Sequence, residues 1–369
     1  MSEPGQRSYR CAIVGTGAIA AAHAQALREH VGRADLVAVV DLDPDRATAF
    51  ARTWSVPRVS PDLTALLQRE AVDLVHLCTP PAHHAPLALQ VLAAGASVLV
   101  EKPPTMSLAE LDALIAAQSR STGSVATVFQ HRFGAAAARL RRMAAAGELG
   151  RPLLATCLTQ WYRDDAYFAV PWRGRWDTEG GGPTMGHGIH QFDLLLSVLG
   201  PWESVTALAV RRARDVQTED VSMALVTFPD GTVASVVNSV VSPRQTSALR
   251  FDYEYATVEL DHLYGYTSAD WTITATPGHD DVAARWHADP AGPPSGHGRQ
   301  VAAVLDALDA GRPPPVDLAD TRITMEFIAA LYASAFTGER VHRGEIGPNH
   351  PFAHRMDGTG APWQAATRR

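Results

Sequence analysis

Short apolar runs alternate with amphipathic stretches through the first third of the chain, from Arg10 onward. The apolar runs have the length of buried strands and lie at 11–14, 36–40, 74–77, 98–100 and 125–129. The stretches between them predict helices at 18–29, 43–53, 63–69, 85–94 and 108–119, several of which open with Asp, Ser or Pro. Strands that alternate with helices in this way are typical of an α/β domain built on a doubly wound parallel sheet.

The pattern changes beyond Arg132, where strand-length segments alternate between apolar and polar residues. They lie at 153–158, 204–210, 221–228, 233–241 and 256–260, after an alanine-rich helix predicted at 135–146. Such alternation predicts half-exposed strands of an open mixed, largely antiparallel sheet, and Pro229-Asp230-Gly231 predicts a hairpin between two of them. Residues 277–299 and the tail after Gly344 have the composition of loops. We therefore expect two domains, 1–130 and 131–369, of which the second is α+β.

Composition excludes several classes of partner. A net charge of −7 and a pI near 6.1 lack the basic surface that nucleic acid or anionic lipid requires, so we expect neither nucleic acid nor membrane as a partner. Cys11, Cys78 and Cys157 have no C-x-x-C spacing, which indicates neither a disulfide framework nor a thiolate metal site. The polar N-terminus is unlike a signal peptide, and no apolar stretch has the length of a membrane span. We expect a cytoplasmic protein.

The first candidate site is the segment 15–20, sequence GTGAIA, which follows the first predicted strand and opens the first predicted helix. Glycine at 15 permits a tight turn, glycine at 17 lets backbone N–H groups approach a pyrophosphate, and a small residue at 20 permits close packing of helix on strand. This context favours a dinucleotide site over a merely structural turn. The residues expected to contact the cofactor are Gly15, Thr16, Gly17, Ala18 and Ile19.

Asp41 ends the second predicted strand, where a carboxylate can accept hydrogen bonds from the adenosine ribose hydroxyls. A carboxylate there repels a 2′-phosphate, so NAD is the expected cofactor and NADP is less favoured, although Arg46 softens that preference. Asp43 has the alternative role of capping the next helix.

Two further segments stand at the ends of predicted strands. Thr79-Pro80-Pro81 precedes His84, and this loop either contacts the nicotinamide ribose or is only a proline-rich turn that starts a helix. Glu101-Lys102-Pro103 follows the next strand. Open α/β sheets bind ligands at the carboxyl ends of their strands, so we expect Lys102 at the same edge as the glycine turn. The alternative is a surface lysine paired with Glu101.

Glycine is dense at 180–188, sequence GGGPTMGHG, ahead of His190 and Asp193. Such a segment favours a helix entry where backbone can approach a ligand closely. The regular spacing of His187, His190 and Asp193 raises the alternative of a metal site. Without a pattern of the H-E-x-x-H type, however, we expect no metal. A hydrogen-bonded core histidine is the third interpretation, and it suits His187 better than His190.

Aromatic and arginine residues cluster between the two predicted domains. They are Trp161, Tyr162, Arg163, Tyr167, Phe168, Trp172, Arg173 and Trp176. In a pocket, aromatic rings stack on the C–H faces of sugars while arginine and tyrosine bind hydroxyl groups, which favours a polyhydroxylated ligand. Core packing or a subunit contact is the competing interpretation.

Taken in order, these motifs resemble the family of glucose-fructose oxidoreductase, inositol dehydrogenase and the rhizopine-catabolism proteins (Gfo/Idh/MocA). The matching residues are the glycine turn, Asp41, Thr79-Pro80 with His84, Glu101-Lys102-Pro103, Gln130 with Arg132 and Phe133, Trp172-Arg173, the glycines at 180–182, Gly188 with His190 and Asp193, and Tyr332 with Ser334 and Thr337-Gly338. The resemblance implies an N-terminal Rossmann domain and a C-terminal domain with an open mixed sheet. It also implies a homodimer or homotetramer formed through the exposed face of that sheet.

The resemblance further implies oxidation of a secondary alcohol of a sugar, cyclitol or glycoside with NAD(P), or the reverse reduction, with the substrate between the two domains. By this likeness Lys102 takes the hydroxyl proton, His190 assists it, and the bond between Lys102 and Pro103 is cis. The remaining cofactor-binding residues that it implies are Thr79, Pro80, His84, Glu101, Lys102, Gln130, Trp172 and Arg173. The implied substrate-binding residues are Lys102, Arg132, Tyr162, His187 and His190.

One position departs from the family pattern. Many members carry Asp four residues before the histidine, as D-x-x-x-H, whereas this chain has Gly186 there. Candidate replacements are His187, Asp164, Asp165 and Asp177, or Lys102 and His190 suffice. The departure leaves one alternative function open, a catalytically silent dinucleotide sensor. A further alternative is a reductase of a non-sugar carbonyl such as a dihydrodiol or tetrapyrrole, which the resemblance also allows and the aromatic cluster does not exclude.

Overall fold

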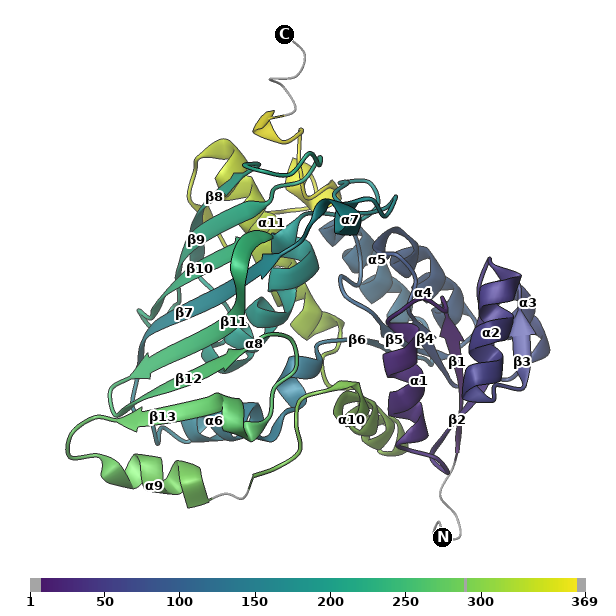
Figure 1. The fold of residues 1–369 in the computed structure, drawn as a ribbon, viewed down its shortest axis with the longest axis horizontal. Helices are drawn as coiled ribbons and strands as arrows, with labels where there is room; N and C mark the ends of the chain where they lie inside the picture. Colours follow the sequence, from purple (N-terminus) through teal and green to yellow (C-terminus); the bar gives the residue numbers. More distant parts are fainter. Residues whose placement is uncertain (1–7, 289–290, 364–369) are drawn as a thin grey trace. The chain divides into compact units, whose positions relative to one another are not determined.

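The computed structural model describes residues 8–288 and 291–363, and the polar segment 1–7 lies outside them. The described chain forms two compact units (Figure 1). Unit 1 takes its described residues from Met1–Thr105, Glu110–Val128 and His297–Thr321, and unit 2 takes them from Met106–Ala109, Phe129–Gly296 and Arg322–Arg369. None of the described helices combines the length and apolar character needed to cross a membrane.

Unit 1 is built on a parallel six-stranded sheet with strand order β3-β2-β1-β4-β5-β6. Its strands are β1 (Tyr9–Val14), β2 (Ala34–Val40), β3 (Arg58–Ser60), β4 (Leu74–Leu77), β5 (Ser97–Val100) and β6 (Val125–Thr127). Its helices are α1 (Ala20–Arg28), α2 (Pro44–Trp54), α3 (Leu63–Arg69), η1 (Pro81–His83), α4 (His84–Ala93), α5 (Leu108–Gln118, whose first residues belong to unit 2) and α10 (His297–Asp309). This strand order is that of the Rossmann sheet, which confirms the predicted fold class.

Local sequence explains most of these elements. Asp43 caps α2, because its carboxylate accepts hydrogen bonds from the backbone N–H groups of Asp45 and Arg46 at 3.1 and 3.0 Å. Asp62 caps α3 in the same way through Ala65, at 2.7 Å. Strand β3 has no counterpart among the predicted strands, because it is short and largely exposed and so no apolar run marks it.

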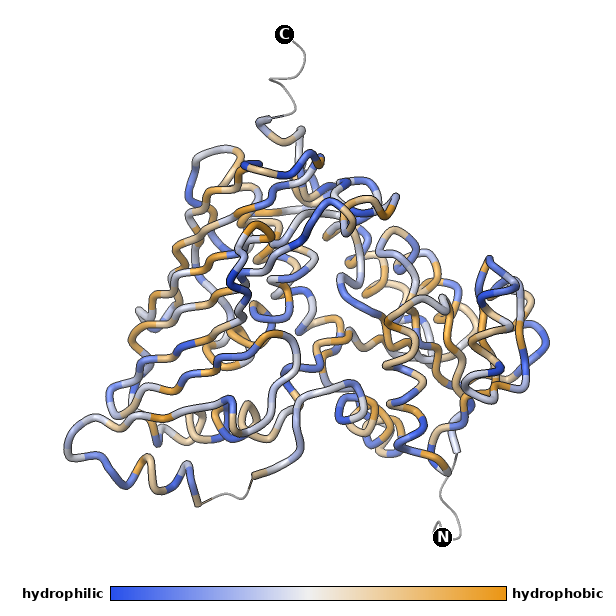
Figure 2. The backbone as a smooth tube through the Cα atoms, viewed as in Figure 1, coloured by the Kyte–Doolittle hydropathy of each residue, from blue (hydrophilic) through white to orange (hydrophobic). Residues whose placement is uncertain are grey.

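The core of unit 1 includes a segment from late in the sequence. Ile13 of β1, Leu27 of α1 and Val301 and Leu305 of α10 belong to one buried apolar cluster. Gln300 strengthens this packing, since its Nε2 donates a hydrogen bond to the carbonyl oxygen of Thr127 at 2.6 Å. Helix α10 therefore completes the N-terminal sheet domain, although it lies far from that sheet in sequence. In Figure 2 the central strands of this sheet are mostly hydrophobic.

Unit 2 contains an eight-stranded sheet with order β13-β12-β11-β7-β10-β9-β8-β14. Its strands are β7 (Pro152–Tyr162), β8 (Ser204–Val210), β9 (Val221–Thr227), β10 (Val233–Ser239), β11 (Val241–Tyr253), β12 (Ala256–His262), β13 (Trp271–Ala275) and β14 (Val341–His342). Its helices are η2 (Gln130–Phe133), α6 (Ala135–Ala145), α7 (Asp165–Phe168), η3 (Thr184–Gly188), α8 (Ile189–Leu199), η4 (Ser268–Asp270), α9 (Asp280–Ala288), α11 (Leu318–Thr337, whose first residues belong to unit 1) and α12 (Pro351–His354). Only β7 and β10 pair in parallel, so the predicted mixed, largely antiparallel sheet is confirmed.

One face of this sheet is covered by helices and the other carries exposed side chains. On the covered face, Phe192 of α8 and Phe327 of α11 pack with ring centroids 5.2 Å apart, and Ser334 of α11 accepts a hydrogen bond from the N–H of Ala207 at 3.0 Å. The predicted hairpin is present between β9 and β10, where Gly231 has φ of +88°. The period-two alternation read from the sequence therefore marks which face of each strand is buried.

The prediction that 277–299 is a loop is wrong over much of its length. Helix α9 occupies Asp280–Ala288, and α10 begins at His297. The α9 side chains of Val282 and Trp286 are buried, and Trp286 packs 6.3 Å from the ring centroid of Trp271 in β13. These two buried residues lie one turn apart, so the sequence of the helix shows little apolar periodicity among the flanking prolines and glycines. The short helix α12 likewise interrupts the predicted C-terminal tail.

Candidate active site

Four loops of unit 1 meet at one edge of its sheet, because they follow the carboxyl ends of the parallel strands β1, β2, β4 and β5. Gly15 follows β1 with φ of +86°, a conformation that L side chains rarely adopt. A Cβ added to it would also lie 2.8 Å from the carbonyl oxygen of Cys78, in the loop after β4. By contrast, a Cβ added to Gly17 would have no neighbouring segment within 4 Å. The turn is thus packed against the protein at Gly15 and open to a ligand at Gly17.

Asp41 follows β2 and lies beside this turn. Its Oδ2 accepts hydrogen bonds from the backbone N–H and the hydroxyl of Thr16, both at 2.7 Å, and its Oδ1 lies 2.6 Å from Nη2 of Arg46. Burial acts to raise the pKa of Asp41, but the hydrogen bonds from Arg46, the Asp43 backbone and Thr16 outweigh it and hold that pKa below its ordinary value. The carboxylate is therefore ionised and fixed next to the turn, as a ribose-binding role requires.

His84 connects two of the edge loops. Its Nδ1 lies 2.7 Å from the carbonyl oxygen of Pro103, and its Nε2 lies 2.8 Å from that of Thr79. Burial lowers the pKa of His84, although both carbonyl contacts act to raise it. The ring holds the loop of Thr79 and Pro80 against the segment after Lys102. The peptide bond between Lys102 and Pro103 is cis, as the resemblance implies.

Glu101 anchors the lysine-bearing segment from inside the domain. Its buried carboxylate accepts a hydrogen bond from the Lys102 N–H at 3.1 Å, and Nε2 of His23 and of His297 lie 3.0 and 3.2 Å from its Oε1. Nδ1 of His23 lies 2.8 Å from Nδ1 of His76. Burial acts to raise the pKa of Glu101, but the two imidazoles reverse that effect and hold the pKa well below its ordinary value. Glu101 therefore faces the domain interior, while Lys102 is half-buried at the sheet edge.

The ligand atoms of His23, Glu101 and His297 lie within 4.8 Å of one another, close enough for a metal ion. Two imidazoles and a carboxylate are a ligand set that zinc accepts. The same atoms also satisfy one another, because His76 can donate to His23, and His23 and His297 to Glu101, at ordinary hydrogen-bond lengths. The hydrogen-bonded cluster accounts for this geometry, and we assign no metal to it.

The predicted site residues divide between the two units. Unit 1 carries Gly15, Thr16, Gly17, Ala18, Ile19, Asp41, Thr79, Pro80, His84, Glu101 and Lys102. Unit 2 carries Gln130, Arg132, Tyr162, Trp172, Arg173, His187 and His190. The first set gathers around one sheet edge, and the second is spread over several segments of unit 2.

The triple glycine of unit 2 allows close packing ahead of α8. A Cβ added to Gly181 would collide with the hydroxyl of Tyr332, and one added to Gly182 would collide with the carbonyl oxygen of Glu219. The buried Glu219 carboxylate also accepts a hydrogen bond from the Gly182 N–H at 3.1 Å. These contacts lead into a π-helical turn, Thr184–Gly188, which runs directly into α8. The segment is therefore a helix entry, as the glycine density predicts.

The two histidines of this entry lie in different groups of side chains. His190 is buried in the first turn of α8, with its ring centroid 4.9 Å from that of His131 and 5.8 Å from that of Tyr264. His187 lies one turn earlier, where its Nε2 is 3.3 Å from the hydroxyl of Tyr167. Trp161 links the two groups, because its ring centroid lies 5.0 Å from that of His187 and 6.2 Å from that of Tyr264.

Gln130 and Arg132 lie in the turn η2 and bind other side chains of unit 2. Gln130 donates a hydrogen bond from Nε2 to the hydroxyl of Tyr264 at 3.0 Å. Arg132 pairs with the buried carboxylate of Asp193 at 2.6 Å. Asp193, which the spacing allowed as a metal ligand, thus balances a guanidinium.

Arg173 is the centre of a stacked group. Its guanidinium lies over the ring of Tyr167, 3.9 Å from the centroid, and over that of Trp172, at 4.3 Å. Tyr162 ends β7 and is 42% exposed, with the Arg214 guanidinium 5.0 Å from its ring centroid. Arg173 is half-buried by comparison, so the members of the aromatic cluster predicted from the sequence differ in their exposure to solvent.

The carboxylates proposed to replace the acid missing at Gly186 serve other purposes. Asp164 caps α7 by accepting a hydrogen bond from the N–H of Tyr167 at 2.9 Å. Asp177 pairs with Arg175 at the surface, at 3.0 Å. The buried Glu179 instead places its Oε1 3.6 Å from a Cβ added to Gly186.

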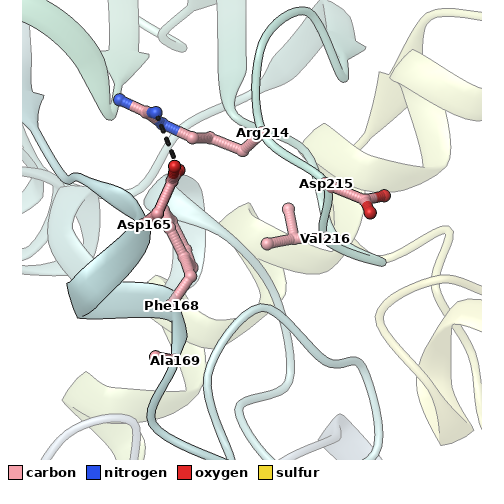
Figure 3. A pocket seen from close by; sticks show the side chains of 6 residues that line it. All are labelled: Asp165, Phe168, Ala169, Arg214, Asp215 and Val216. Carbon is pink, nitrogen blue, oxygen red and sulfur yellow. Dashed lines mark hydrogen bonds and ion pairs between the residues drawn. The ribbon is translucent and has the colours of Figure 1, made fainter.

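Asp165, the third of these candidates, lines an open pocket at the surface of unit 2. The pocket is formed by Asp165, Phe168, Ala169, Arg214, Asp215 and Val216. The Asp165 carboxylate points toward the Arg214 guanidinium, 3.3 Å away (Figure 3). The Asp165 side chain is 99% exposed, so the pair is a surface contact and offers no buried acid.

Sequence reasoning missed four residues of these clusters: His23, His76, His297 and Glu179. His23 and His76 lie within an ordinary helix and strand, and His297 stands 196 residues from the carboxylate that it contacts. Glu179 directly precedes the triple glycine, and that position beside a helix entry is the one local signal that could have indicated it.

Comparison with known proteins assigns the chain to a family. Residues 9–129 match the model described as oxidoreductase family, NAD-binding Rossmann fold, and residues 137–259 match the GFO/IDH/MocA C-terminal domain. The two matches together span more than half of the chain. The protein therefore belongs to the GFO/IDH/MocA family of oxidoreductases with an NAD-binding Rossmann fold.

Individual relatives are dehydrogenases. The chain is 33% identical to inositol 2-dehydrogenase 4 of Saccharopolyspora erythraea over 56% of its own length and 58% of that enzyme's. It is 30% identical to scyllo-inositol 2-dehydrogenase (NAD(+)) of Bacillus subtilis, over 64% and 69% of the two chains. Its fold is similar to that of the WlbA dehydrogenase from Bordetella pertussis in complex with NADH and UDP-GlcNAcA, with a TM-score of 0.81, 26% identity, and 91% and 99% of the two chains covered.

Proposed function

We propose that the protein oxidises a secondary alcohol on a polyhydroxylated ring, such as a sugar, cyclitol or glycoside, or reduces the corresponding ketone, with Lys102 as the acid-base group. The family assignment supports the cofactor and the type of reaction. Two relatives named as inositol dehydrogenases and a similar structure in complex with a sugar nucleotide support the class of substrate.

One observation about Lys102 carries the proposal. The chain contains 31 arginines and a single lysine, and that lysine follows β5 at the edge where the glycine turn and Asp41 lie. A guanidinium stays protonated in proteins, whereas an amine can lose and regain its proton. The chain therefore uses arginine at every other basic position and keeps lysine where a proton must be exchanged.

The residues of unit 1 fit NAD. Gly17 offers open space at the start of α1, where backbone N–H groups and the helix dipole favour a pyrophosphate. The ionised Asp41 carboxylate is suited to ribose hydroxyls and repels a 2′-phosphate. Arg46 partly neutralises that carboxylate, so we expect NAD to be preferred without NADP being strictly excluded.

NAD, when bound, supplies the hydride acceptor. The Lys102 amine takes the hydroxyl proton as the alcohol becomes a carbonyl, and it returns that proton in the reverse direction. Glu101 holds the Lys102 backbone through its 3.1 Å hydrogen bond. From unit 2, His190 is proposed to hydrogen-bond the reacting oxygen, and Tyr162 and His187 to bind other hydroxyl groups of the ring.

The single lysine permits a direct test. In protein labelled with ¹³C-lysine, the only lysine side-chain signal belongs to Lys102, and we expect NAD to shift its titration to lower pH because like charge disfavours the protonated amine. With a panel of inositols, sugars and glycosides, Lys102→Ala and Lys102→Arg should both lose about 10²–10⁴-fold in kcat. NAD binding should persist in both variants.

Two outcomes would contradict this proposal. Turnover by Lys102→Ala within a few-fold of wild type would eliminate the lysine as acid-base group. Wild-type protein that binds NAD but reduces it with no member of the panel would favour a dinucleotide sensor, the alternative that Gly186 leaves open.

A further inference from the structure

Glu179 is a buried carboxylate that joins two segments of unit 2. Its Oε2 accepts a hydrogen bond from the N–H of Gly174 at 2.6 Å, and its Oε1 lies 3.4 Å from Nη1 of Arg173. The same Oε1 lies 3.6 Å from the position of a Cβ on Gly186. The carboxylate therefore lies between the loop that carries Arg173 and the π-helical turn that carries His187.

A chain of contacts continues from Arg173 to His187. Nη1 of Arg173 donates a hydrogen bond to the hydroxyl oxygen of Tyr167, and that hydroxyl lies 3.3 Å from Nε2 of His187. Because a guanidinium only donates, the Tyr167 hydroxyl accepts from Arg173 and keeps its own hydrogen for another acceptor, and Nε2 of His187 lies within reach of it. When the hydroxyl donates to Nε2, His187 is in the tautomer that carries its proton on Nδ1.

The charges of Glu179 and of the nearby arginines also affect the pKa of Tyr167. Burial raises the pKa of Tyr167, and the negative charge of Glu179 raises it further, while Arg173 and Arg163 act to lower it. The phenol therefore stays protonated and remains a donor near neutral pH. The ion pair with Arg173 in turn balances a carboxylate that would be costly to bury alone.

We propose that Glu179 is a positioning residue of the site, which acts through Arg173 and Tyr167 to hold His187 in one tautomer and one orientation. The inference rests on the proposed function, in which His187 binds a hydroxyl group of the substrate. Glutamine at position 179 would preserve the shape but remove the charge that holds the guanidinium. Tyr167 would then lose the contact that orients its hydroxyl toward His187.

Histidine-selective ¹⁵N labelling tests this without relying on turnover. The His187 signals, assigned by comparison with His187→Asn, should show the proton on Nδ1 in the wild type. Glu179→Gln and Tyr167→Phe should both shift His187 toward a mixture of tautomers, and kcat/KM should fall by about 10-fold, mostly through KM. Asp177→Asn is the matched control, because it neutralises an exposed carboxylate two residues earlier that pairs with Arg175.

Moving the charge provides a second test. A Cβ at position 186 makes only an ordinary van der Waals contact, so Gly186→Asp combined with Glu179→Gln returns a carboxylate to the same space. We expect the double variant to recover the wild-type His187 tautomer. A double variant that behaves like Glu179→Gln alone would contradict the need for a negative charge there.

The outcomes separate this inference from the proposed function. Unchanged His187 signals in Glu179→Gln overturn the inference, whatever the activity of the wild type. A tautomer shift in a protein that turns over no member of the substrate panel upholds the inference about Glu179 and defeats the proposed dehydrogenase activity. Should Glu179→Gln fail to fold, Tyr167→Phe gives the same readout, since it removes one hydroxyl from a half-buried side chain.

Discussion

Arg132 and Asp193 form an ion pair with two parallel hydrogen bonds. Nε of Arg132 lies 2.7 Å from Oδ2 of Asp193, and Nη2 lies 2.6 Å from Oδ1. The Asp193 side chain is fully buried on α8, and 15% of the Arg132 side chain is exposed. A pair of this geometry fixes orientation as well as charge. It therefore ties the turn η2 to the helix that carries His190.

Breaking this pair should destabilise unit 2. Asp193→Ala removes the buried carboxylate that balances the Arg132 guanidinium, and we expect the free energy of unfolding to fall by about 3–5 kcal/mol in urea denaturation. The comparison is Asp177→Ala, which removes an exposed partner of Arg175 and should change stability by less than about 1 kcal/mol. Equal losses of unfolding free energy in the two variants would show that burial of the Arg132–Asp193 pair adds nothing to stability.

Gly15 and Gly17 should respond to alanine in opposite ways. Gly15→Ala strains a left-handed backbone and drives a Cβ to 2.8 Å from the Cys78 carbonyl, so we expect a loss of about 1–3 kcal/mol in stability. Gly17→Ala meets no neighbouring segment and should leave the unfolding midpoint unchanged. It should still weaken NAD binding by about 10-fold or more, as measured by calorimetric titration, because its Cβ occupies the proposed pyrophosphate space. If Gly17→Ala bound NAD with wild-type affinity, the pyrophosphate would have to lie elsewhere.

The buried histidines around Glu101 should make stability depend on pH. Burial lowers the pKa of His23, and lowers that of His76 well below its ordinary value of 6.5. Below that value the unfolded chain binds protons that the folded chain does not, so stability decreases as the pH falls. The decrease between pH 7 and pH 5 should reach about 2 kcal/mol for one such histidine.

Replacing His76 should reduce this dependence. His76→Val removes one of the groups that titrate only on unfolding, so the plot of unfolding midpoint against pH should be flatter between pH 7 and pH 5. His83→Asn, a change of an exposed histidine in the same unit, should keep the wild-type slope. A His76→Val plot parallel to the wild type would contradict the assignment of the slope to this cluster.

The uncovered face of the unit 2 sheet should mediate self-association. Leu208, Met223 and Leu225 are 56, 50 and 68% exposed, and Leu208 lies directly opposite Met223 on the neighbouring strand. A contiguous apolar patch of this kind is typical of an interaction surface. We expect a homodimer or homotetramer by light scattering and a shift toward monomer in Leu225→Glu. Leu263→Glu, which adds the same charge beyond the end of β12, should leave the mass unchanged. A Leu225→Glu protein with the wild-type mass would exclude this face.

Residues close in sequence determined a large part of this protein. The apolar runs that became β1, β2, β4, β5 and β6, the Asp43 cap and the hairpin turn at Gly231 all depend on neighbours within a few positions. Periodicity and turn chemistry could therefore predict them. The sheet order then placed Gly15 and Lys102 at the same edge, because parallel strands end on the same side.

Other features were decided only by the tertiary structure. Helix α9 is stabilised by a few contacts with β13, and His297 reaches Glu101 across 196 residues of sequence. Glu179 fills the space beside Gly186 because the intervening glycine-rich segment turns back on itself, which no spacing of charged residues reveals. His297 and Glu101 are distant in the chain, whereas the partners of Glu179 and of α9 are nearer in sequence. The physical reason is common to all three: each contact forms only when the chain between the partners folds back and packs, and no local pattern of residues determines that packing.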